Sequence, residues 1–268
     1  MLDLENVKYL SKENIRSLAP SVFSEKPSRE VSKHYVHIPT ERVINDMEVL
    51  GWKVVDAKEV AARTTATKGF QKHLLVFRND EIVINGEDGD TVFPQILLTN
   101  SHDAKNAFTF TAGLFRMVCE NGLVISTKEF GSVRVRHMGY DFAKVQETIK
   151  EIVEQLPLTV ESMNKMKATE LNQEKAVEFA KKALNTRFTD DELNRIKIDV
   201  TELLKPVREE DKGSDLWSIF NVVQEKIIEG DFEYRAAGKN RKAREIKNFR
   251  QDIKVNEKLF DLALEYVS

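Results

Sequence analysis

The spacing of apolar residues changes near residue 140, and this change constrains the fold more than any other feature of the chain. Before it, apolar and polar residues mostly alternate, as in Phe108–Ala112, which is typical of strands with one buried face. After it, apolar residues recur every three or four positions, as in Phe142, Val145 and Ile149, which is typical of amphipathic helices. We therefore expect an α+β protein, with an antiparallel sheet domain over residues 1–156 and, over residues 157–268, a helical region with a basic C-terminal segment.

Within the first region we expect one helix, capped by Thr40, and several short strands. These strands are predicted over residues 35–38, 52–65, 70–78, 93–99 and 108–112. The run Leu114–Val118 fits either a short helix or a strand that enters a hairpin at Asn121-Gly122, and we favour the helix. Leu123–Ile125 and Val133–His137 are then expected to pair with each other as a hairpin.

Beyond residue 140 the helix boundaries are read from capping and breaking residues. Pro157 is expected to end the first helix, and a second helix is predicted over residues 160–184. Thr189 opens a third helix, and Ser214-Asp215 caps a fourth. One or two final helices are expected from Lys242 to Val267.

Several classes of function are disfavoured by what the sequence lacks. No run of about 18 apolar residues occurs, so no membrane-spanning helix is expected. The first residues do not resemble a signal peptide, and a single cysteine fits a reducing cytoplasm. The chain contains no GxxxxGK[ST], GxGxxG or GxSxG motif, so we expect no cofactor, no nucleotide-driven chemistry and no serine hydrolase.

The net charge of −3 conceals one strongly basic segment. Residues 235–254 hold eight bases and two acids, a net charge of +6, whereas residues 201–234 hold four bases and nine acids, a net charge of −5. A polyanion would bind such a basic segment first. Lys247, Arg250 and Lys254 would then extend a track for a phosphate backbone. The alternative is a solvated helix face, or neutralisation by the preceding acidic segment.

Three arginines in the sheet region are further candidates for holding phosphates. Arg116 lies within an apolar run, where a charge needs either a carboxylate partner or an anionic ligand. Arg134 and Arg136 alternate with valines and therefore share one strand face, from which two guanidinium groups could bind phosphates. A solvated strand face is the alternative.

The segment Asn100, Ser101, His102 and Asp103 is typical of a turn in which short polar side chains bond the backbone, and it would shape a site beside the arginines. His102 and Asp103, with Cys119 and His137, also offer nitrogen, oxygen and sulfur donors that suit zinc or iron. Their spacing matches no compact metal motif, and Cys119 in an apolar run is typical of a small buried residue. A metal site therefore remains an alternative to the turn.

Several segments carry a resemblance to a known family: Pro20–Phe23, Tyr35–Thr40, Gly51-Trp52, Leu98–Asp103, Gly113–Leu123 and Val135–His137. They resemble the phage- and plasmid-type family catalogued as domain of unknown function 932. The resemblance implies an origin in a phage, prophage or plasmid and work in the cytoplasm of a bacterium or infected host. It implies no activity, so no catalytic residue is carried over. Ala104 stands where the family often has glycine, which disfavours a turn with positive φ there.

The order of a helix, several strands and a long helix from Asp141 is also similar, at the level of fold alone, to phage single-strand annealing proteins. We therefore expect a non-enzymatic nucleic-acid-binding protein, with single-stranded DNA favoured, that acts in replication, recombination or counter-defence. A homo-oligomer and a complex with a host protein both stay open. Two alternatives stay open. One is a metal-dependent enzyme acting on nucleic acid, and the other is an assembly module that blocks or recruits a host protein.

Overall fold

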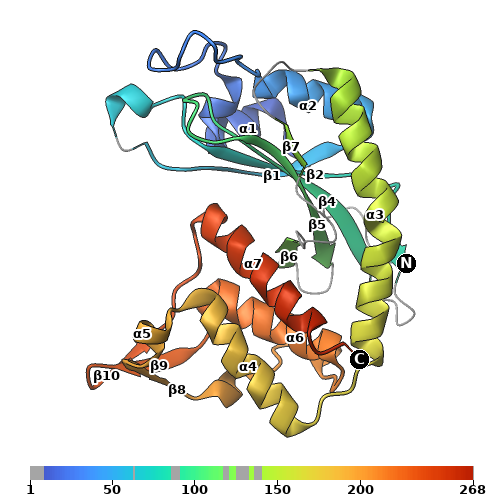
Figure 1. Cartoon of the computed structure of the whole chain (residues 1–268), viewed down its shortest axis with the longest axis vertical. Helices are drawn as coiled ribbons and strands as arrows, with labels where there is room; N and C mark the ends of the chain where they lie inside the picture. Colours follow the sequence, from blue (N-terminus) through green and yellow to red (C-terminus); the bar gives the residue numbers. More distant parts are fainter. Residues whose placement is uncertain are drawn as a thin grey trace. The chain divides into compact units, whose positions relative to one another are not determined.

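The computed structural model describes residues 9–62, 64–85, 91–116, 121–124, 133–135 and 141–267, which divide into two compact units, residues 1–155 and 156–268. The first unit is built on an antiparallel sheet, and the second is mainly helical with a small sheet of its own (Figure 1). The predicted α+β class is therefore confirmed.

The first unit contains a seven-stranded sheet and short helices. Its elements are α1 (Lys12–Leu18), the 3₁₀ turn η2 (Pro20–Phe23), α2 (Thr40–Val49), β1 (Lys53–Glu59), the 3₁₀ turn η3 (Thr65–Thr67), β2 (His73–Arg78), β3 (Ile84–Asn85), β4 (Thr91–Asn100), β5 (Phe108–Arg116), β6 (Asn121–Val124) and β7 (Val133–Val135). The strand order is β1-β2-β4-β5-β6, while β3 pairs with β4 and β7 pairs with β5. All of these pairs are antiparallel.

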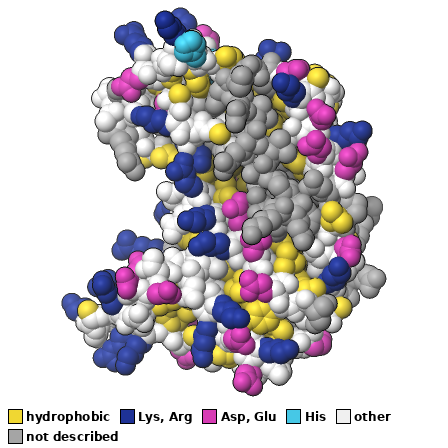
Figure 2. Space-filling view, viewed as in Figure 1, with side chains coloured by type: hydrophobic (Ala, Val, Ile, Leu, Met, Phe, Trp, Pro, Cys, Tyr) yellow, Lys and Arg dark blue, Asp and Glu magenta, His cyan; other side chains and the backbone are white. Residues whose placement is uncertain are grey.

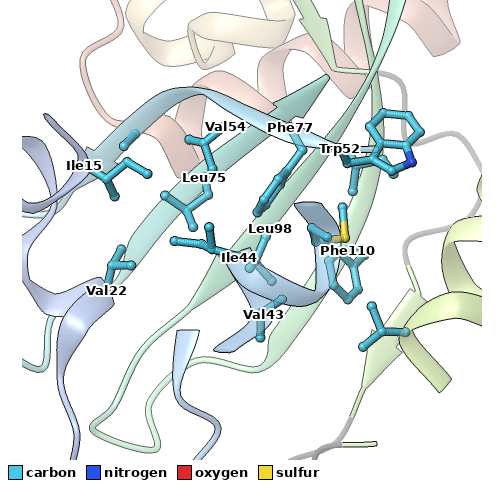
Figure 3. Packing of buried hydrophobic residues seen from close by; sticks show 14 of the residues in the cluster. Ile15, Val22, Val43, Ile44, Trp52, Val54, Leu75, Phe77, Leu98 and Phe110 are labelled. Atoms are coloured by element: carbon cyan, nitrogen blue, oxygen red, sulfur yellow. The ribbon is translucent and has the colours of Figure 1, made fainter. Parts of the chain in front are cut away.

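The core of the first unit lies between this sheet and the helices. The continuous apolar run in β2 is buried on both faces, as expected for a central strand. Val43 and Ile44 of α2 lie beside Leu75 and Leu98 of the sheet (Figure 3), and all four side chains are fully buried. Burying side chains of this size supplies the main driving force for docking α2 on the sheet.

Two predictions for the segment before α2 are wrong. Residues 35–38 do not form a strand, and Thr40 is the first residue of α2 instead of its cap. Pro39 occupies the cap position without any side-chain cap bond. The Thr40 hydroxyl is instead turned into the protein, where it bonds two buried polar side chains.

The prediction of a helix over residues 114–118 is also wrong, and the strand alternative is correct as far as Arg116. Strand β5 continues to Arg116 because β4 offers it a ladder partner along this length, with Val92 opposite Arg116. Long-range pairing of this kind outweighs a local helical spacing. Strand β7 pairs with β5, so the expected hairpin between residues 123–125 and 133–137 is replaced by two separate pairings with β5.

The second unit packs three helices around an aromatic core. The chain reaches it along α3 (Phe142–Ala168), and the other elements are α4 (Gln173–Arg187), α5 (Asp190–Leu193), β8 (Ile196–Ile198), η4 (Val200–Leu204), η5 (Glu209–Asp211), α6 (Leu216–Glu225), the π-turn η6 (Lys226–Gly230), β9 (Glu233–Ala236), β10 (Lys239–Lys242) and α7 (Phe249–Leu264). Phe179 of α4, Phe220 of α6 and Phe260 of α7 are fully buried. The Phe220 and Phe260 rings meet edge to face, with centroids 6.0 Å apart.

Side-chain caps fix where these helices begin. Asp215 accepts from the Ser218 amide at the start of α6, as the sequence predicts. Asn172 accepts from the Lys175 amide at the start of α4, a cap that was not predicted. Pro157 lies inside α3 and does not end it, so the predicted break is wrong. The break comes instead after Ala168, and the second helix accordingly begins at Gln173.

The β9–β10 hairpin was not predicted, and the final helix begins at Phe249, later than expected. The two strands are polar and largely exposed, so they lack the apolar alternation that marks a strand. Their turn uses Ala237 and Gly238, both with positive φ (49° and 78°), as a two-residue hairpin requires. None of the helices in the described part of the chain has the length and apolar character needed to cross a membrane.

Candidate functional site

The motifs of the first unit converge on a buried polar cluster. Three histidines from separate segments meet there: the His37 and His102 rings are 4.6 Å apart, and the His73 and His102 rings are 5.2 Å apart, between centroids. We call these residues, with Ser21, Thr40, Asn100 and Ser101, the histidine cluster. His73, Thr40, Asn100 and His102 are 0 % exposed.

A chain of hydrogen bonds determines the protonation of His73. The Asn100 amide orientation is fixed because its oxygen accepts from the Ser101 N–H at 2.8 Å, so its nitrogen donates to the Thr40 hydroxyl at 3.0 Å. The Thr40 proton is then directed to His73 Nε2, at 2.9 Å. His73 Nδ1–H donates to Ser21 Oγ at 2.8 Å, and Ser21 in turn donates to the Gln71 carbonyl. This arrangement favours the neutral tautomer of His73 that carries its proton on Nδ1.

The segment Asn100–Asp103 is a turn that ties the chain before α2, called here the N-terminal arm, to the sheet. The His102 amide donates to the Phe70 carbonyl at 3.1 Å, and the His102 carbonyl accepts from the Ser28 amide at 2.8 Å. The Asp103 carboxylate accepts from the Ser101 hydroxyl and the Lys105 amide. Ala104 follows with a φ of 60°, so the turn keeps a positive φ without glycine, contrary to the sequence-based expectation.

The chemistry available to the histidine cluster is limited by burial. Desolvation lowers the pKa of His73 to about 4, so this ring is uncharged at neutral pH. Among the residues that the structure describes, no three His, Cys, Asp or Glu side chains are grouped to hold a metal ion. The candidate ligands Cys119 and His137 lie outside the described residues. The cluster thus holds the arm to the sheet and presents no open site.

The sheet arginines can be located only in part. Arg116 ends β5 opposite Val92 and Asn121, and Arg134 lies in β7 opposite Thr109. The side chains of both residues, and all of Arg136, lie outside the described part of the chain.

A basic groove is present in the second unit. It has a volume of about 690 Å³ and brings together cations and aromatic rings from three segments. It is lined by Arg187, Phe188, Tyr234, Arg241, Lys242, Ala243 and Arg244. Figure 2 shows lysine and arginine side chains gathered over the β9–β10 hairpin, at the lower left of the view.

Pairing in the small sheet places the key groove residues on one face. Tyr234 of β9 is the register partner of Arg241 of β10, so both side chains emerge on the same side. Arg235, the next residue of β9, faces the opposite side, with Lys197 and Asn240 as its partners. Lys242, opposite Glu233, emerges on the Arg235 face although it lines the groove, so the pairing itself places only Tyr234 and Arg241 together.

Arg187, the last residue of α4, lines the groove and connects two of the segments around it. Its guanidinium donates to the carbonyls of Ile227 and Arg244, and burial lowers its pKa. The same group lies 5.5 Å from the centroid of the Phe188 ring. Gly230 has a φ of 74°, and a Cβ there would lie 2.4 Å from the Arg244 backbone. Only glycine permits this close approach.

Carboxylates neutralise only part of the groove. Asp231 pairs with Lys242 and with Lys226, at 2.9 Å each, and the hydrogen bonds from these two ammonium groups lower the pKa of Asp231 to about 2. Arg241 and Arg244 form no ion pair with any carboxylate of the described residues. Both side chains are exposed, so the groove retains a positive charge that can attract an anion.

The predicted C-terminal track and the observed groove overlap only in part. Lys247, Arg250 and Lys254 are exposed, in the segment before α7 and in its first turns, but they do not line the groove. The groove cations Arg241, Lys242 and Arg244 belong to the same basic segment and could have been chosen from the charge pattern. Arg187 and Phe188 come from the end of a distant helix, and no local pattern in the sequence marks them.

Comparisons with known proteins agree with the motif resemblance. The family described as "Domain of unknown function (DUF932)" matches residues 28–260. The chain is 31% identical to the UPF0380 protein YafZ of Escherichia coli (strain K12) over 255 residues, which cover 95% of this chain and 90% of the relative. It is 30% identical, with the same coverage, to the UPF0380 protein YfjQ of that strain. No solved structure matches the chain. This protein therefore belongs to the family of the domain of unknown function 932.

Proposed function

We propose that this protein binds nucleic acid, and that the basic groove of the second unit is where the phosphate backbone is held. The observation that carries the proposal is the composition of the groove, in which four cationic side chains accompany two aromatic ones. Guanidinium groups form forked hydrogen bonds with phosphates, and aromatic rings contact bases or sugars. This combination favours a nucleic acid over a small inorganic anion or an acidic peptide, neither of which would use the rings.

Uncompensated charge supports the same conclusion. Arg241 and Arg244 are exposed and free of ion pairs with described carboxylates, so binding a phosphate there does not require breaking an existing salt bridge. Lys242 is shared with Asp231, so it contributes less. Lys239, which precedes Arg241 on the same face of β10, extends the positive surface beyond the groove. A backbone that follows this surface would meet several cations in succession.

In the biological setting that the motif resemblance implies, such binding would serve replication, recombination or counter-defence of a phage, prophage or plasmid. The protein would act there as a binder and not as a catalyst. The groove offers guanidinium, ammonium and aromatic groups, which are suited to grip phosphates and bases. Its described lining includes no histidine or carboxylate that could act as a general base.

The test is the salt dependence of binding to a labelled single-stranded oligonucleotide, measured by fluorescence anisotropy at ionic strengths from about 50 to 200 mM. Replacing Arg241→Gln and Arg244→Gln together should weaken binding and lower the salt slope by about 1.4, because each lost phosphate contact on a single strand removes roughly 0.7. The double variant Arg250→Gln with Lys254→Gln is the matched control, with charges lost from the same basic segment outside the groove.

A smaller change in the control than in the groove variant would support the proposal. An equal change in both variants would contradict the groove as the main phosphate site, and a larger change in the control would place the binding surface along α7, as the sequence pattern suggested. Absence of oligonucleotide binding by the unmodified protein at about 50 mM salt would refute nucleic-acid binding altogether.

A further inference from the structure

The two aromatic rings of the basic groove are arranged so that they can receive a base. Phe188 and Tyr234 are both half-buried and both line the groove. Their centroids are 6.4 Å apart and their planes are inclined by 61°, so the rings do not stack on each other. Because both rings keep part of their surface exposed, a flat ligand that enters the groove can contact that exposed part.

Contacts with Arg187 and Phe232 fix the Phe188 ring before any ligand binds. The Arg187 guanidinium lies 5.5 Å from the Phe188 centroid, and the Phe232 ring meets Phe188 edge to face at 6.3 Å. Arg187 is held in turn by its two bonds to the carbonyls of Ile227 and Arg244. A ring that is already fixed loses little conformational freedom on binding, which favours affinity.

The cations are placed to hold the phosphate that adjoins such a base. Arg241 is the register partner of Tyr234 and emerges on the same face of the small sheet. Arg244 lies across the groove on the segment that Arg187 fixes, and it forms no ion pair with a described carboxylate. Ring and guanidinium therefore stand side by side, as the alternation of base and phosphate along a strand requires.

We propose that the basic groove binds an unpaired nucleotide, with its base against Tyr234 and Phe188 and its adjacent phosphate on Arg241 and Arg244. This inference rests on the proposed function and specifies its ligand as single-stranded nucleic acid. In a duplex the bases are paired and stacked on one another, so the rings would find no free base face. The groove volume of about 690 Å³ lies in the range of sites that enclose a small organic ligand, such as one nucleotide.

The experiment compares oligonucleotides that carry the same total number of phosphates, bound to the full chain at low salt. The probes are a thymidine oligonucleotide, its abasic counterpart with the same sugar-phosphate backbone, a blunt duplex, and a uridine oligonucleotide to separate DNA from RNA. Removing the bases should weaken binding roughly 5- to 150-fold, which is the range expected for the loss of base–aromatic stacking. The duplex should bind more weakly than the thymidine strand.

Two variants of Tyr234 test whether the groove causes the tighter binding of the thymidine strand over the abasic strand. Tyr234→Leu should bind the thymidine and abasic strands almost equally, whereas Tyr234→Phe should keep the preference, because the Tyr234 hydroxyl forms no hydrogen bond with a described residue and the ring is retained. Arg241→Gln should weaken both strands alike, and Arg235→Gln, on the opposite face of β9, should weaken them less. Circular dichroism and thermal unfolding of each variant show whether the fold is intact.

The outcomes separate this inference from the proposed function. If the protein binds the thymidine, abasic and duplex probes equally, nucleic-acid binding stands and the unpaired-nucleotide site is wrong. If Tyr234→Leu folds and keeps the full preference for bases over the abasic strand, the rings are not the base site. If no probe binds at all, both the inference and the proposed function are refuted.

Discussion

Protonation of His73 should destabilise the first unit between neutral and mildly acidic pH. The ring is fully buried beside the His102 ring, and its Nε2 is committed to accepting a hydrogen bond from Thr40. A proton on Nε2 would remove that acceptor and place a charge in a desolvated position. The Glu59 carboxylate belongs to the surrounding hydrogen-bond network, and it is already engaged by the Ser21 amide and the Gln71 side chain.

The magnitude follows from the pKa of His73, which burial lowers from 6.5 to about 4. Above pH 6.5 neither the folded nor the unfolded chain binds this proton, so stability is unaffected. Between pH 6.5 and 4 only the unfolded chain binds it, so the free energy of unfolding falls as the pH falls. The loss should reach about 2 kcal/mol near pH 5 and about 3 kcal/mol near pH 4, because the free energy of unfolding falls by ~1.36 kcal/mol for each pH unit between the two pKa values.

Each unit contains one tryptophan, which allows the first unit to be followed by itself. Trp52 is buried in the first unit and Trp217 in the second, so a Trp217→Phe background leaves Trp52 as the only reporter. Urea unfolding is measured from about pH 7.5 to 4.5 in this background, with and without His73→Gln. Glutamine keeps a donor and an acceptor but does not titrate, so the carboxylates contribute equally to both curves.

The expected result is that the unmodified first unit loses about 2.5 kcal/mol more than the His73→Gln variant over this range. Parallel curves would refute the reasoning. So would a His73 titration by nuclear magnetic resonance with a midpoint near pH 6.5, because it would show that the ring gains its proton without cost to the fold.

Two glycine and alanine exchanges test the backbone geometry of the turns. Ala104 is exposed and has a φ of 60°, which glycine adopts at lower cost than alanine. Ala104→Gly should therefore raise the free energy of unfolding of the first unit by about 0.5–1 kcal/mol. A loss of stability in urea unfolding would contradict this conformation. Gly230→Ala should cost about 2–5 kcal/mol in the second unit, followed by Trp217 fluorescence, since its Cβ would meet the Arg244 backbone. The control Gly238→Ala has a similar φ of 78° but open space around it, so it should cost only about 1–2 kcal/mol; equal losses would mean that the contact with Arg244 is not tight.

Local patterns in the sequence were sufficient for the fold class and for much of the second unit. Apolar alternation identified β5 as far as Ala112, and the Asp215 cap placed the start of α6 correctly. Such features depend on residues within a few positions of one another, where the backbone geometry is fixed by the helix or strand itself. The family membership likewise followed from short motifs that can be read without knowing where they lie in space.

Contacts between residues that are far apart in the chain could be identified only from the tertiary structure. The partner of β7, the extension of β5 to Arg116 and the inward turn of Thr40 were all decided by contacts with β4, β5 or His73, and in each case a local pattern favoured something else. Pro157 is another example, because it lies inside α3. A proline often marks the end of a helix, but some helices continue through one.

For the candidate site too, the sequence revealed some features and the tertiary structure revealed others. The charge pattern located the basic segment that contains Arg241 and Arg244, but it did not show that these residues flank aromatic rings. Phe188 and Tyr234 meet because α4 ends against the small sheet, and no local pattern encodes that meeting. The sequence alone therefore determined the fold class, the family and the position of the basic segment. The folded chain decided which distant side chains share a surface, because such contacts arise from packing and not from spacing along the chain.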